Sequence, residues 1–226
     1  MEKENQLFVP LLRIKEPIVI AEVSRLLDAL PPSPIAYAPW AGDAEQPEVS
    51  VVLAHGQGAV HLKYYIRERA IRAEYLNFND PVFKDSCVEF FVAFNGDPNY
   101  YNLEFNCVGT CRGMYGPGKT EREFLPASML KQIHHHTRFK SRQPGQIEWE
   151  MTLSIPYSVF TYHPALQGNS FSAKGNFYKC GDELPEPHYL CWNKISAAEP
   201  NFHLPEFFAE IRFEQAAGTT ETNENN

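Results

Sequence analysis

The stretch SCVEFFVAFNGDPNYYNLEFNC, residues 86–107, decides the fold of this chain. Its two halves each alternate in polarity with a period of two, as β-strands do, and the segment NGDPN between them (residues 95–99) consists of residues that favour turns. The stretch therefore predicts an antiparallel hairpin. Pairing Glu89 with Asn106, or one step along with Glu104, keeps the apolar side chains of both strands on one face.

The two faces of this hairpin differ chemically. One face carries Val, Phe, Tyr and Leu side chains and is expected to cover a core. The other combines carboxylates, amides and aromatic rings, and its members are Cys87, Glu89, Phe91, Tyr100, Asn102, Glu104 and Asn106. A sheet with these two faces resembles a platform for a sugar, which is a first hypothesis about function.

Short segments of strand-like alternation continue on both sides of the hairpin. They cover residues 49–53, 60–67, 71–75, 109–116, 147–155, 171–177 and 207–213. Such segments, separated by turns, predict an all-β fold, an antiparallel β-sandwich that is jelly-roll-like with immunoglobulin-like layers. Before them, residues 22–30 carry apolar side chains at helical spacing and predict one short helix.

The 226 residues are enough for one large domain with appendages. We expect an N-terminal extension with the short helix over residues 1–34, the sandwich over residues 35–214, and a disordered tail over residues 215–226. The apolar parts of the extension predict that it packs on the sandwich.

Composition excludes several partners. The formal charge of −8, with scattered Lys and Arg, argues against a nucleic acid partner. No run of about 18 apolar residues exists, so no membrane span is expected. Residues 1–5 lack the basic start and apolar region of a secretory signal, which predicts a cytoplasmic protein. The five cysteines are odd in number and lie mostly in strand-like runs, so we expect reduced thiols.

Three pieces of sequence, in this order, resemble the family 9 carbohydrate-binding modules, β-sandwich domains often appended to xylanases. The first is FKDSCVEFF (residues 83–91), similar to the family's W-x-x-D-S-V-E-x-F strand. The second is LEFN (residues 103–106), and the third is LCWN (190–193) followed by PNFHLPEFF (200–208). The resemblance covers roughly residues 35–214, and the order and spacing of the pieces carry it.

The resemblance implies that two aromatic rings sandwich a sugar at the reducing end of a glycan, while a strand glutamate binds its hydroxyls. By position the rings would be Phe83 and Phe202, and the glutamate would be Glu89. Both ring positions hold Phe where the family usually has Trp, so the stacking face is smaller. The family's structural calcium sites cannot be assigned to residues of this chain, and we expect no metal or other cofactor.

Four more residues complete the predicted carbohydrate-binding site. Glu104 and Asn106 share the polar face with Glu89. Arg112 either forks to two sugar hydroxyls or neutralises the carboxylates. Trp192 follows a predicted strand, where it is either a ligand contact or a core side chain.

Other conspicuous residues have plainer explanations. Trp149 lies on the core side of its segment by alternation, and Trp40 is expected to cover an edge of the sandwich. The run His134–His136 is typical of ordinary surface residues, since a third ligand is missing nearby. Cys107 and Cys111 lack the second pair of a zinc site.

The predicted function is a non-catalytic module that stacks a mono- or oligosaccharide and assists glycan breakdown. One alternative is a jelly-roll glycoside hydrolase, which needs two carboxylates at a set separation. Glu89 with Glu104, or Glu148 with Glu150, would be candidate pairs. However, the chain has no E-x-D-x-x-E, G-x-S-x-G or H-E-x-x-H motif, so no catalytic residue is predicted.

A second alternative is a sandwich that binds a protein partner. It would use Phe83, Phe202 and Trp40 as an exposed apolar patch.

Overall fold

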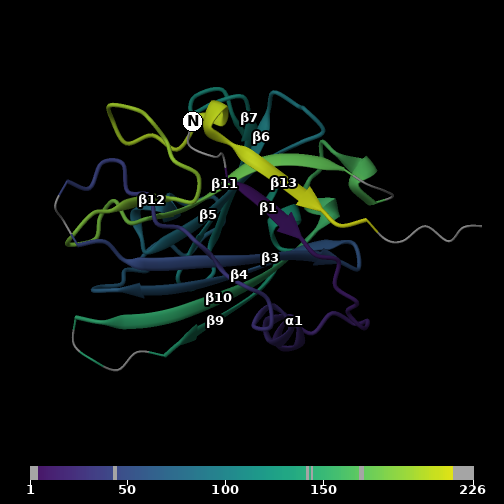
Figure 1. Cartoon of the computed structure of the whole chain (residues 1–226), viewed down its shortest axis with the longest axis horizontal. Coiled ribbons are helices and arrows are strands. Elements are labelled where there is room, and N and C mark those ends of the chain that lie inside the picture. Colours follow the sequence, from purple (N-terminus) through teal and green to yellow (C-terminus); the bar gives the residue numbers. More distant parts are fainter. Residues whose placement is uncertain (1–4, 43–44, 141–142, 144, 168–170, 216–226) are drawn as a thin grey trace, which may run out of the picture.

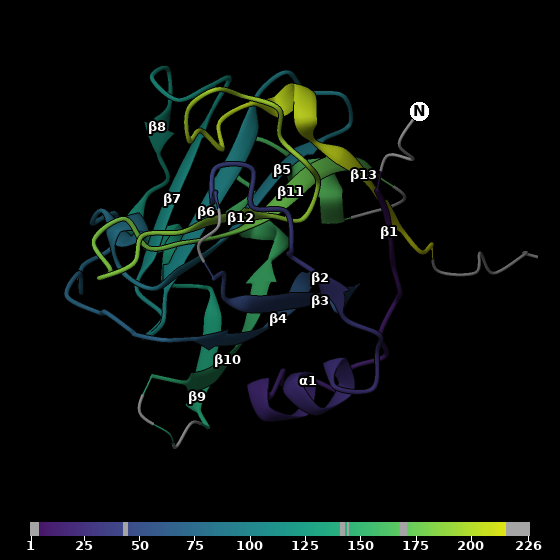
Figure 2. The same ribbon diagram turned by 60° about the vertical axis from the view of Figure 1, so that its left-hand side comes forward.

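Two β-sheets packed face to face form the body of the molecule (Figure 1, Figure 2). The computed structural model describes residues 5–42, 45–140, 143, 145–167 and 171–215. The predicted antiparallel β-sandwich is confirmed. The tail predicted to be disordered lies outside the described residues from residue 216 onward.

The first sheet contains the hairpin. Its strands follow the order β1 (Gln6–Val9), β13 (Ala209–Phe213), β11 (Ser172–Cys180), β5 (Cys87–Phe94), β6 (Tyr100–Asn106), β7 (Cys111–Gly116) and β8 (Glu123–Phe124), and β12 (Tyr189–Cys191) pairs with β11. Neighbouring strands are antiparallel except β1 and β13, which run parallel.

The second sheet is antiparallel throughout. Its strands follow the order β2 (Ser33–Pro34), β3 (Glu48–Gly56), β4 (Ala59–Glu68), β10 (Ile147–Pro156) and β9 (His134–Phe139). The helical segments are α1 (Ile20–Leu27), α2 (Ala127–Leu130) and the 3-10 turns Val82–Lys84, Tyr157–Val159, Pro164–Gln167 and Pro205–Phe207. Within the described ranges, none of these helices has the length and apolar character needed to span a bilayer.

Strands β5 and β6 form the predicted hairpin. Glu89 lies opposite Glu104, the second of the two registers that the sequence allowed. Phe90 of β5 is fully buried and stacks on Phe177 of β11, with ring centroids 5.1 Å apart. In the turn, Asn95 has a φ of 54° and Gly96 a φ of 77°, a left-handed conformation that these two residue types adopt at low cost.

The space between the sheets is filled by alternate apolar side chains of both. Leu62 of β4, Leu103 of β6 and Met151 of β10 are fully buried there, and each such side chain contributes roughly 1.5–3 kcal/mol. Trp149 is 1% exposed, as its parity predicted, and its Nε1 donates a hydrogen bond to Glu68 at 2.7 Å. The core therefore follows directly from the alternation.

The polar face of the hairpin is also buried, which the alternation did not predict. Glu89 and Glu104 are each 3% exposed. The cover comes from the segment around residues 200–208: His203 packs on Phe91 with ring centroids 4.9 Å apart, and Phe208 packs edge-on against Tyr100 at 5.2 Å. An open platform is therefore the wrong description of this face.

The N-terminal extension packs on the sandwich, as predicted, and contributes a strand to each sheet. Strand β1 pairs with β13, and β2 pairs with β3. Helix α1 begins at Ile20 and ends at Leu27, slightly earlier than the predicted 22–30, and its buried Val23 and Leu27 pack against the outer side of the second sheet. Residues 1–34 thus share the architecture of the sandwich.

No strand forms over residues 71–75, contrary to prediction. The backbone N–H groups of Glu74 and Tyr75 donate to the carboxylate of Asp85 at 3.0–3.1 Å instead of to a neighbouring strand. The Arg72 guanidinium also pairs with Asp85, whose side chain is fully buried. A single carboxylate thus satisfies backbone groups that would otherwise need a sheet.

The five cysteines are free and buried.

Candidate functional site

A pocket of about 150 Å³ lies over the polar face of the hairpin. Strands β5, β6 and β7 form its floor, and loops near residues 83, 119–122, 182 and 200–203 form its walls. Pockets for drug-sized ligands begin at about 300 Å³, so this one suits a single small ring. Five of the predicted site residues line it: Phe83, Glu89, Glu104, Arg112 and Phe202.

Glu89 and Glu104 lie opposite each other at the floor of the pocket. Burial, followed by the nearby charge of Glu104, raises the pKa of Glu89 well above its usual value. Burial also raises the pKa of Glu104 to about 7, although Arg112, Arg122 and a hydrogen bond from Asn102 oppose the shift. At neutral pH Glu104 is therefore divided between its two forms, and the buried Glu89 holds a proton more readily than an exposed glutamate does.

Arg112 and Glu104 form an incomplete pair. They are opposite each other on β7 and β6, and Arg112 Nε lies 3.9 Å from Glu104 Oε2, beyond hydrogen-bonding distance. Both atoms are buried and have no hydrogen-bond partner. The remaining groups are used: Arg112 Nη1 donates to the carbonyl of Asn79 at 2.9 Å, and Glu104 Oε1 accepts from Asn102 at 2.8 Å.

Phe83 and Phe202, the two predicted rings, line the same pocket. Phe83 is half-buried beside Arg112, whose guanidinium carbon lies 5.7 Å from the ring centroid. Phe202 is 9% exposed, and Tyr178 stacks on one of its faces at 4.2 Å. Trp40 packs on Phe202 with ring centroids 6.0 Å apart. Phe202 is thus held rigidly and has less free surface than a loop position predicts.

Two predicted residues lie outside the pocket, and both corrections have a packing reason. Asn106 is fully buried: its Nδ2 donates to the Tyr75 carbonyl and to Asp85, and its Oδ1 accepts from the Thr110 N–H. Its amide organises the neighbouring loops. Trp192 is 4% exposed and packs edge-on against Phe177 in the core, with centroids 5.5 Å apart.

Several pocket residues were not predicted. Asn201 and His203 flank Phe202 in the sequence, so the same motif could have indicated them. Lys119 and Arg122 come from the loop between β7 and β8, where no periodicity points to a site. Asp182 enters from the loop after β11, and its position depends on the tertiary fold alone.

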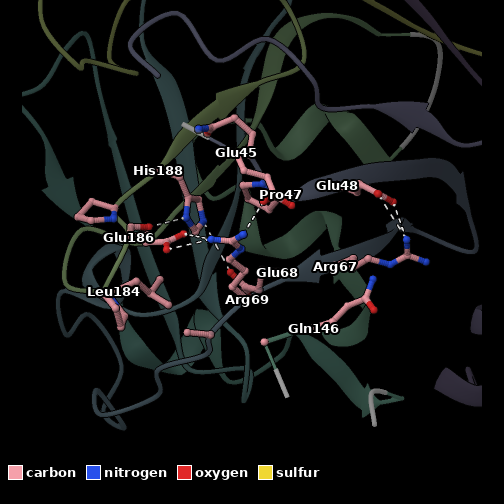
Figure 3. A pocket seen from close by; sticks show the side chains of 15 residues that line it. Glu45, Pro47, Glu48, Arg67, Glu68, Arg69, Gln146, Leu184, Glu186 and His188 are labelled. Atoms are coloured by element: carbon pink, nitrogen blue, oxygen red, sulfur yellow. Dashed lines mark hydrogen bonds and ion pairs between the residues drawn. The ribbon is translucent and has the colours of Figure 1, made fainter. Parts of the chain in front are cut away.

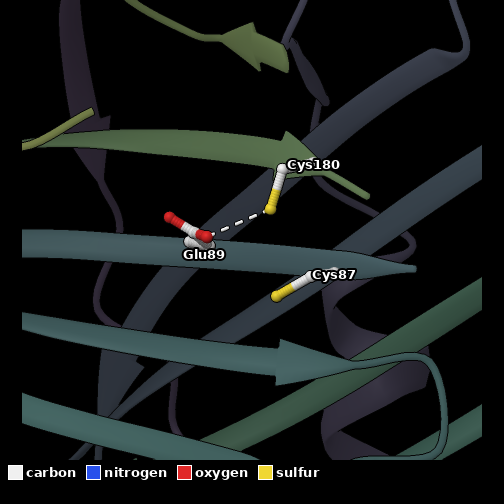
Figure 4. A group of neighbouring side chains, drawn as sticks. All are labelled: Cys87, Glu89 and Cys180. Carbon is white, nitrogen blue, oxygen red and sulfur yellow. Dashed lines mark hydrogen bonds between the residues drawn. The ribbon is translucent and has the colours of Figure 1, made fainter. Parts of the chain in front are cut away.

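Two thiols and a carboxylate lie close together beside the pocket, and two of these residues, Glu89 and Cys180, line it. The donor atoms of Cys87, Glu89 and Cys180 lie within 4.8 Å of one another, and Cys180 Sγ donates to Glu89 at 3.1 Å (Figure 4). Two sulfurs do not suit calcium, which takes oxygen ligands. Burial raises the pKa of Cys87 to about 12 and that of Cys180 well above its usual value, so both are thiols at neutral pH.

A larger hollow of about 430 Å³ lies elsewhere, lined by charged residues of β4 and of the loops near residues 45–48 and 184–188 (Figure 3). Its charges pair with one another: Arg69 lies between Glu45 at 2.6 Å and Glu186 at 3.2 Å, and Arg67 contacts Glu48 at 3.2 Å. None of the predicted site residues lines it. The smaller pocket, which five of the predicted site residues line, is the stronger candidate.

Comparison with known proteins agrees with this fold. The family model for carbohydrate-binding family 9 matches residues 23–213. A crystal structure from Bacteroides uniformis ATCC 8492, described as a candidate carbohydrate-binding protein, superposes with a TM-score of 0.86; it is 32% identical, and the match covers 94% of this chain and 100% of that one. None of the curated proteins matches this chain.

Two more distant structures are family 9 carbohydrate-binding modules from Caldicellulosiruptor kristjanssonii, one in complex with glucose and one with cellotriose. Each has a TM-score of 0.59 and 10% identity, over 96% and 98% of this chain respectively and 100% of the other. At this identity they show the shared fold.

Proposed function

This chain belongs to carbohydrate-binding family 9, and from that premise we propose that it is a non-catalytic module that binds one sugar ring of a glycan in the 150 Å³ pocket. The ring is the reducing end of the glycan, and binding assists glycan breakdown by a separate catalytic unit. Hydrogen bonds and ring stacking supply the affinity, without a metal or other cofactor.

The incomplete pair of Arg112 and Glu104 carries this proposal. Buried polar groups without partners are rare in native proteins and call for an explanation. Here a donor, Arg112 Nε, and an acceptor, Glu104 Oε2, are both unpaired 3.9 Å apart at a pocket wall. A sugar hydroxyl both accepts and donates, so one hydroxyl between them satisfies both atoms. Glu89, at the floor of the same pocket, supplies a second carboxyl for a hydrogen bond to the same ligand.

The two aromatic rings would add stacking contacts with the sugar ring. Phe83 offers a partly exposed ring to the apolar face of the sugar, and Phe202 forms a fixed wall. Each ring contributes about 0.5–1.5 kcal/mol beyond the area that it buries. Two rings and a few hydrogen bonds correspond to dissociation constants from about 1 μM to about 1 mM, or about −8 to −4 kcal/mol.

The arrangement of carboxylates supports binding over hydrolysis. A glycoside hydrolase has to hold the sugars on both sides of the scissile bond between its two carboxylates. Glu89 and Glu104 instead lie side by side at the floor of a pocket suited to one ring. Glu148 and Glu150 are paired with cations, Glu148 with Arg67 at 3.0 Å and Glu150 with Lys63 at 3.5 Å, on a different sheet.

Calorimetric titration tests the proposal. Wild-type protein is titrated with common mono- and oligosaccharides and with oligosaccharides whose reducing end has been converted to an open-chain alcohol. We expect binding that the end reduction abolishes. The substitution Arg112→Met keeps the packing on Phe83 but removes the unpaired donor, and should weaken binding at least tenfold, about 1.4 kcal/mol.

Arg138→Met is the matched control, because Arg138 is exposed on β9 of the second sheet and should bind as the wild type does. No binding to any sugar by the wild type would refute the function. Equal affinity of Arg112→Met and the control would refute the site.

A further inference from the structure

The pocket contains cations that no carboxylate of the protein pairs closely. Three cations, Arg112, Lys119 and Arg122, line it together with three carboxyls. A neutral sugar needs hydrogen-bond partners but no unpaired charge. The cations therefore need an explanation beyond hydroxyl binding.

Arg122 and Lys119 have no carboxylate within 4.0 Å in the described parts of the chain. Arg122 Nη1 instead donates to the amide oxygen of Asn102 at 3.0 Å and lies 3.2 Å from Nε2 of His203. Burial, together with the charges of Arg122 and Lys119, lowers the pKa of His203 to about 3, so this ring is neutral at physiological pH. Asn102 and the neutral His203 therefore hold the Arg122 side chain in place without supplying a negative charge.

The carboxyls of the pocket are withdrawn from water, which weakens their negative charge. Burial raises the pKa of Glu104 to about 7, so Glu104 is ionised in only part of the molecules at neutral pH, and burial also raises the pKa of Glu89 and of Asp182. In the described parts of the chain none of these carboxyls lies within 4.0 Å of a cationic nitrogen of Arg122 or Lys119. A ligand with one negative charge would give these two cations the anionic partner that the protein itself does not place beside them.

Building on the proposed function, we infer that the preferred ligand is a sugar that carries a carboxylate, of the hexuronic acid class. Its carboxylate lies at Arg122 and Lys119, and its ring hydroxyls lie at Glu104 and Arg112. The planar fork of a guanidinium matches a carboxylate in shape. Changing the exocyclic hydroxymethyl group of a hexose to a carboxylate adds little volume, which a pocket of about 150 Å³ tolerates better than a phosphate ester.

Calorimetry at pH 7 and low salt with three matched pairs tests this inference: glucose, galactose and mannose against glucuronic, galacturonic and mannuronic acid. Glucose 6-phosphate is added as a bulkier anion. We expect at least one uronic acid to bind tenfold or more tightly than its neutral parent, and glucose 6-phosphate to bind more weakly than glucuronic acid.

The outcomes separate the two proposals. Binding of neutral sugars with equal or weaker binding of every uronic acid overturns this inference and leaves the proposed function standing. Tightest binding by glucose 6-phosphate overturns the carboxylate assignment. No binding by any of these compounds, nor by their oligomers, overturns both proposals.

Two variants test whether Lys119 and Arg122 bind the carboxylate of the ligand. In Lys119→Gln and Arg122→Gln, the ratio of uronic acid affinity to parent affinity should fall from tenfold or more to threefold or less. Lys119 is exposed and Arg122 only half-buried, so the fold tolerates both changes. Arg212→Gln removes one charge from an exposed position in β13 and is the control for net charge. A ratio that falls equally in the control, or in none of the variants, contradicts the inference.

Discussion

At the scale of single residues, the carboxyl of Glu104 depends most on its surroundings. It is 3% exposed, and burial raises its pKa to about 7. The ionisable groups that face it come from every neighbouring element, namely Glu89, Arg112, Arg122, Asp182, Cys87 and Cys111. A glutamate that alternation alone places on a polar face is therefore only partly ionised at neutral pH in the folded protein.

Glu104 should make the protein less stable as the pH rises. Its pKa is about 7 in the folded state but about 4.5 in an unfolded chain, so the unfolded state releases its proton first. The stability contributed by protonated Glu104 is thus fully present below pH 4.5 and is lost as the pH rises through 7. Glu104→Gln cannot ionise, so its stability relative to the wild type should increase between pH 5 and pH 8, by roughly 1–3 kcal/mol.

Urea denaturation at these two pH values measures the difference. Glu123→Gln, at an exposed position in β8, is the control and should change stability equally at both. The same difference between Glu104→Gln and wild type at pH 5 and pH 8 would contradict the expected burial of an ionisable carboxyl.

At the scale of elements, one side chain can accept the backbone hydrogen bonds that a neighbouring strand would otherwise accept. Residues 71–75 have the alternation of a strand, but their backbone is held by Asp85, which also accepts a hydrogen bond from Asn106 at 2.9 Å. Asp85 directly precedes the hairpin, and Phe83 stands two residues before it. The loop that carries a pocket ring is therefore anchored to the first sheet through this carboxylate.

Asp85→Asn should destabilise the protein by about 3–5 kcal/mol. The substitution removes the buried negative charge that pairs with the Arg72 guanidinium and accepts hydrogen bonds from the backbone of Glu74 and Tyr75. Glu183→Gln is the matched control: Glu183 pairs with the same Arg72 at 2.7 Å, but its side chain is 40% exposed. We expect a change of at most about 1 kcal/mol there. Chemical denaturation of the two variants measures both values, and similar losses would show that burial of Asp85 does not matter.

At the scale of the whole molecule, both sheets depend on the N-terminal extension and all thiols are enclosed. Helix α1 covers the outer face of the second sheet, where Lys63, whose side chain is 1% exposed, pairs with Asp28 at 2.7 Å. The outer face of β4, like the polar face of the hairpin, is therefore covered by a segment distant in sequence. Because such covering segments are distant in sequence, the exclusion of solvent and reagents from buried side chains depends on the entire fold.

The five cysteines should report on that protection. All are at most 2% exposed, and burial raises the pKa of Cys87 and Cys107 to about 12 and that of Cys191 to about 11. A disulfide reagent reacts with thiolates, so fewer than one thiol per chain should react in the native protein at pH 7. In denaturant all five should react in the same time. Rapid labelling of two or more thiols in the native state would contradict the enclosed arrangement.

The amino-acid sequence by itself determined the hairpin, most other strands, the short helix, the apolar core and the residues that resemble the family motif. Alternation and turn preference are local properties, so they can be seen without the fold. They reduced the pairing of Glu89 to two registers and placed Arg112 on a strand. The resemblance to the family motif implied Phe83 and Phe202, and the pocket brings these two rings together with Arg112.

The tertiary structure alone decided what covers each sheet face. It buried Glu89 and Glu104, enclosed Asn106 and Trp192 away from the pocket, and brought in Arg122 from a loop without periodicity. Hydrogen bonds and burial between residues far apart in sequence cause these outcomes, and no local pattern encodes them. The set of charged side chains around the pocket, on which the inferred ligand class rests, therefore follows from long-range packing.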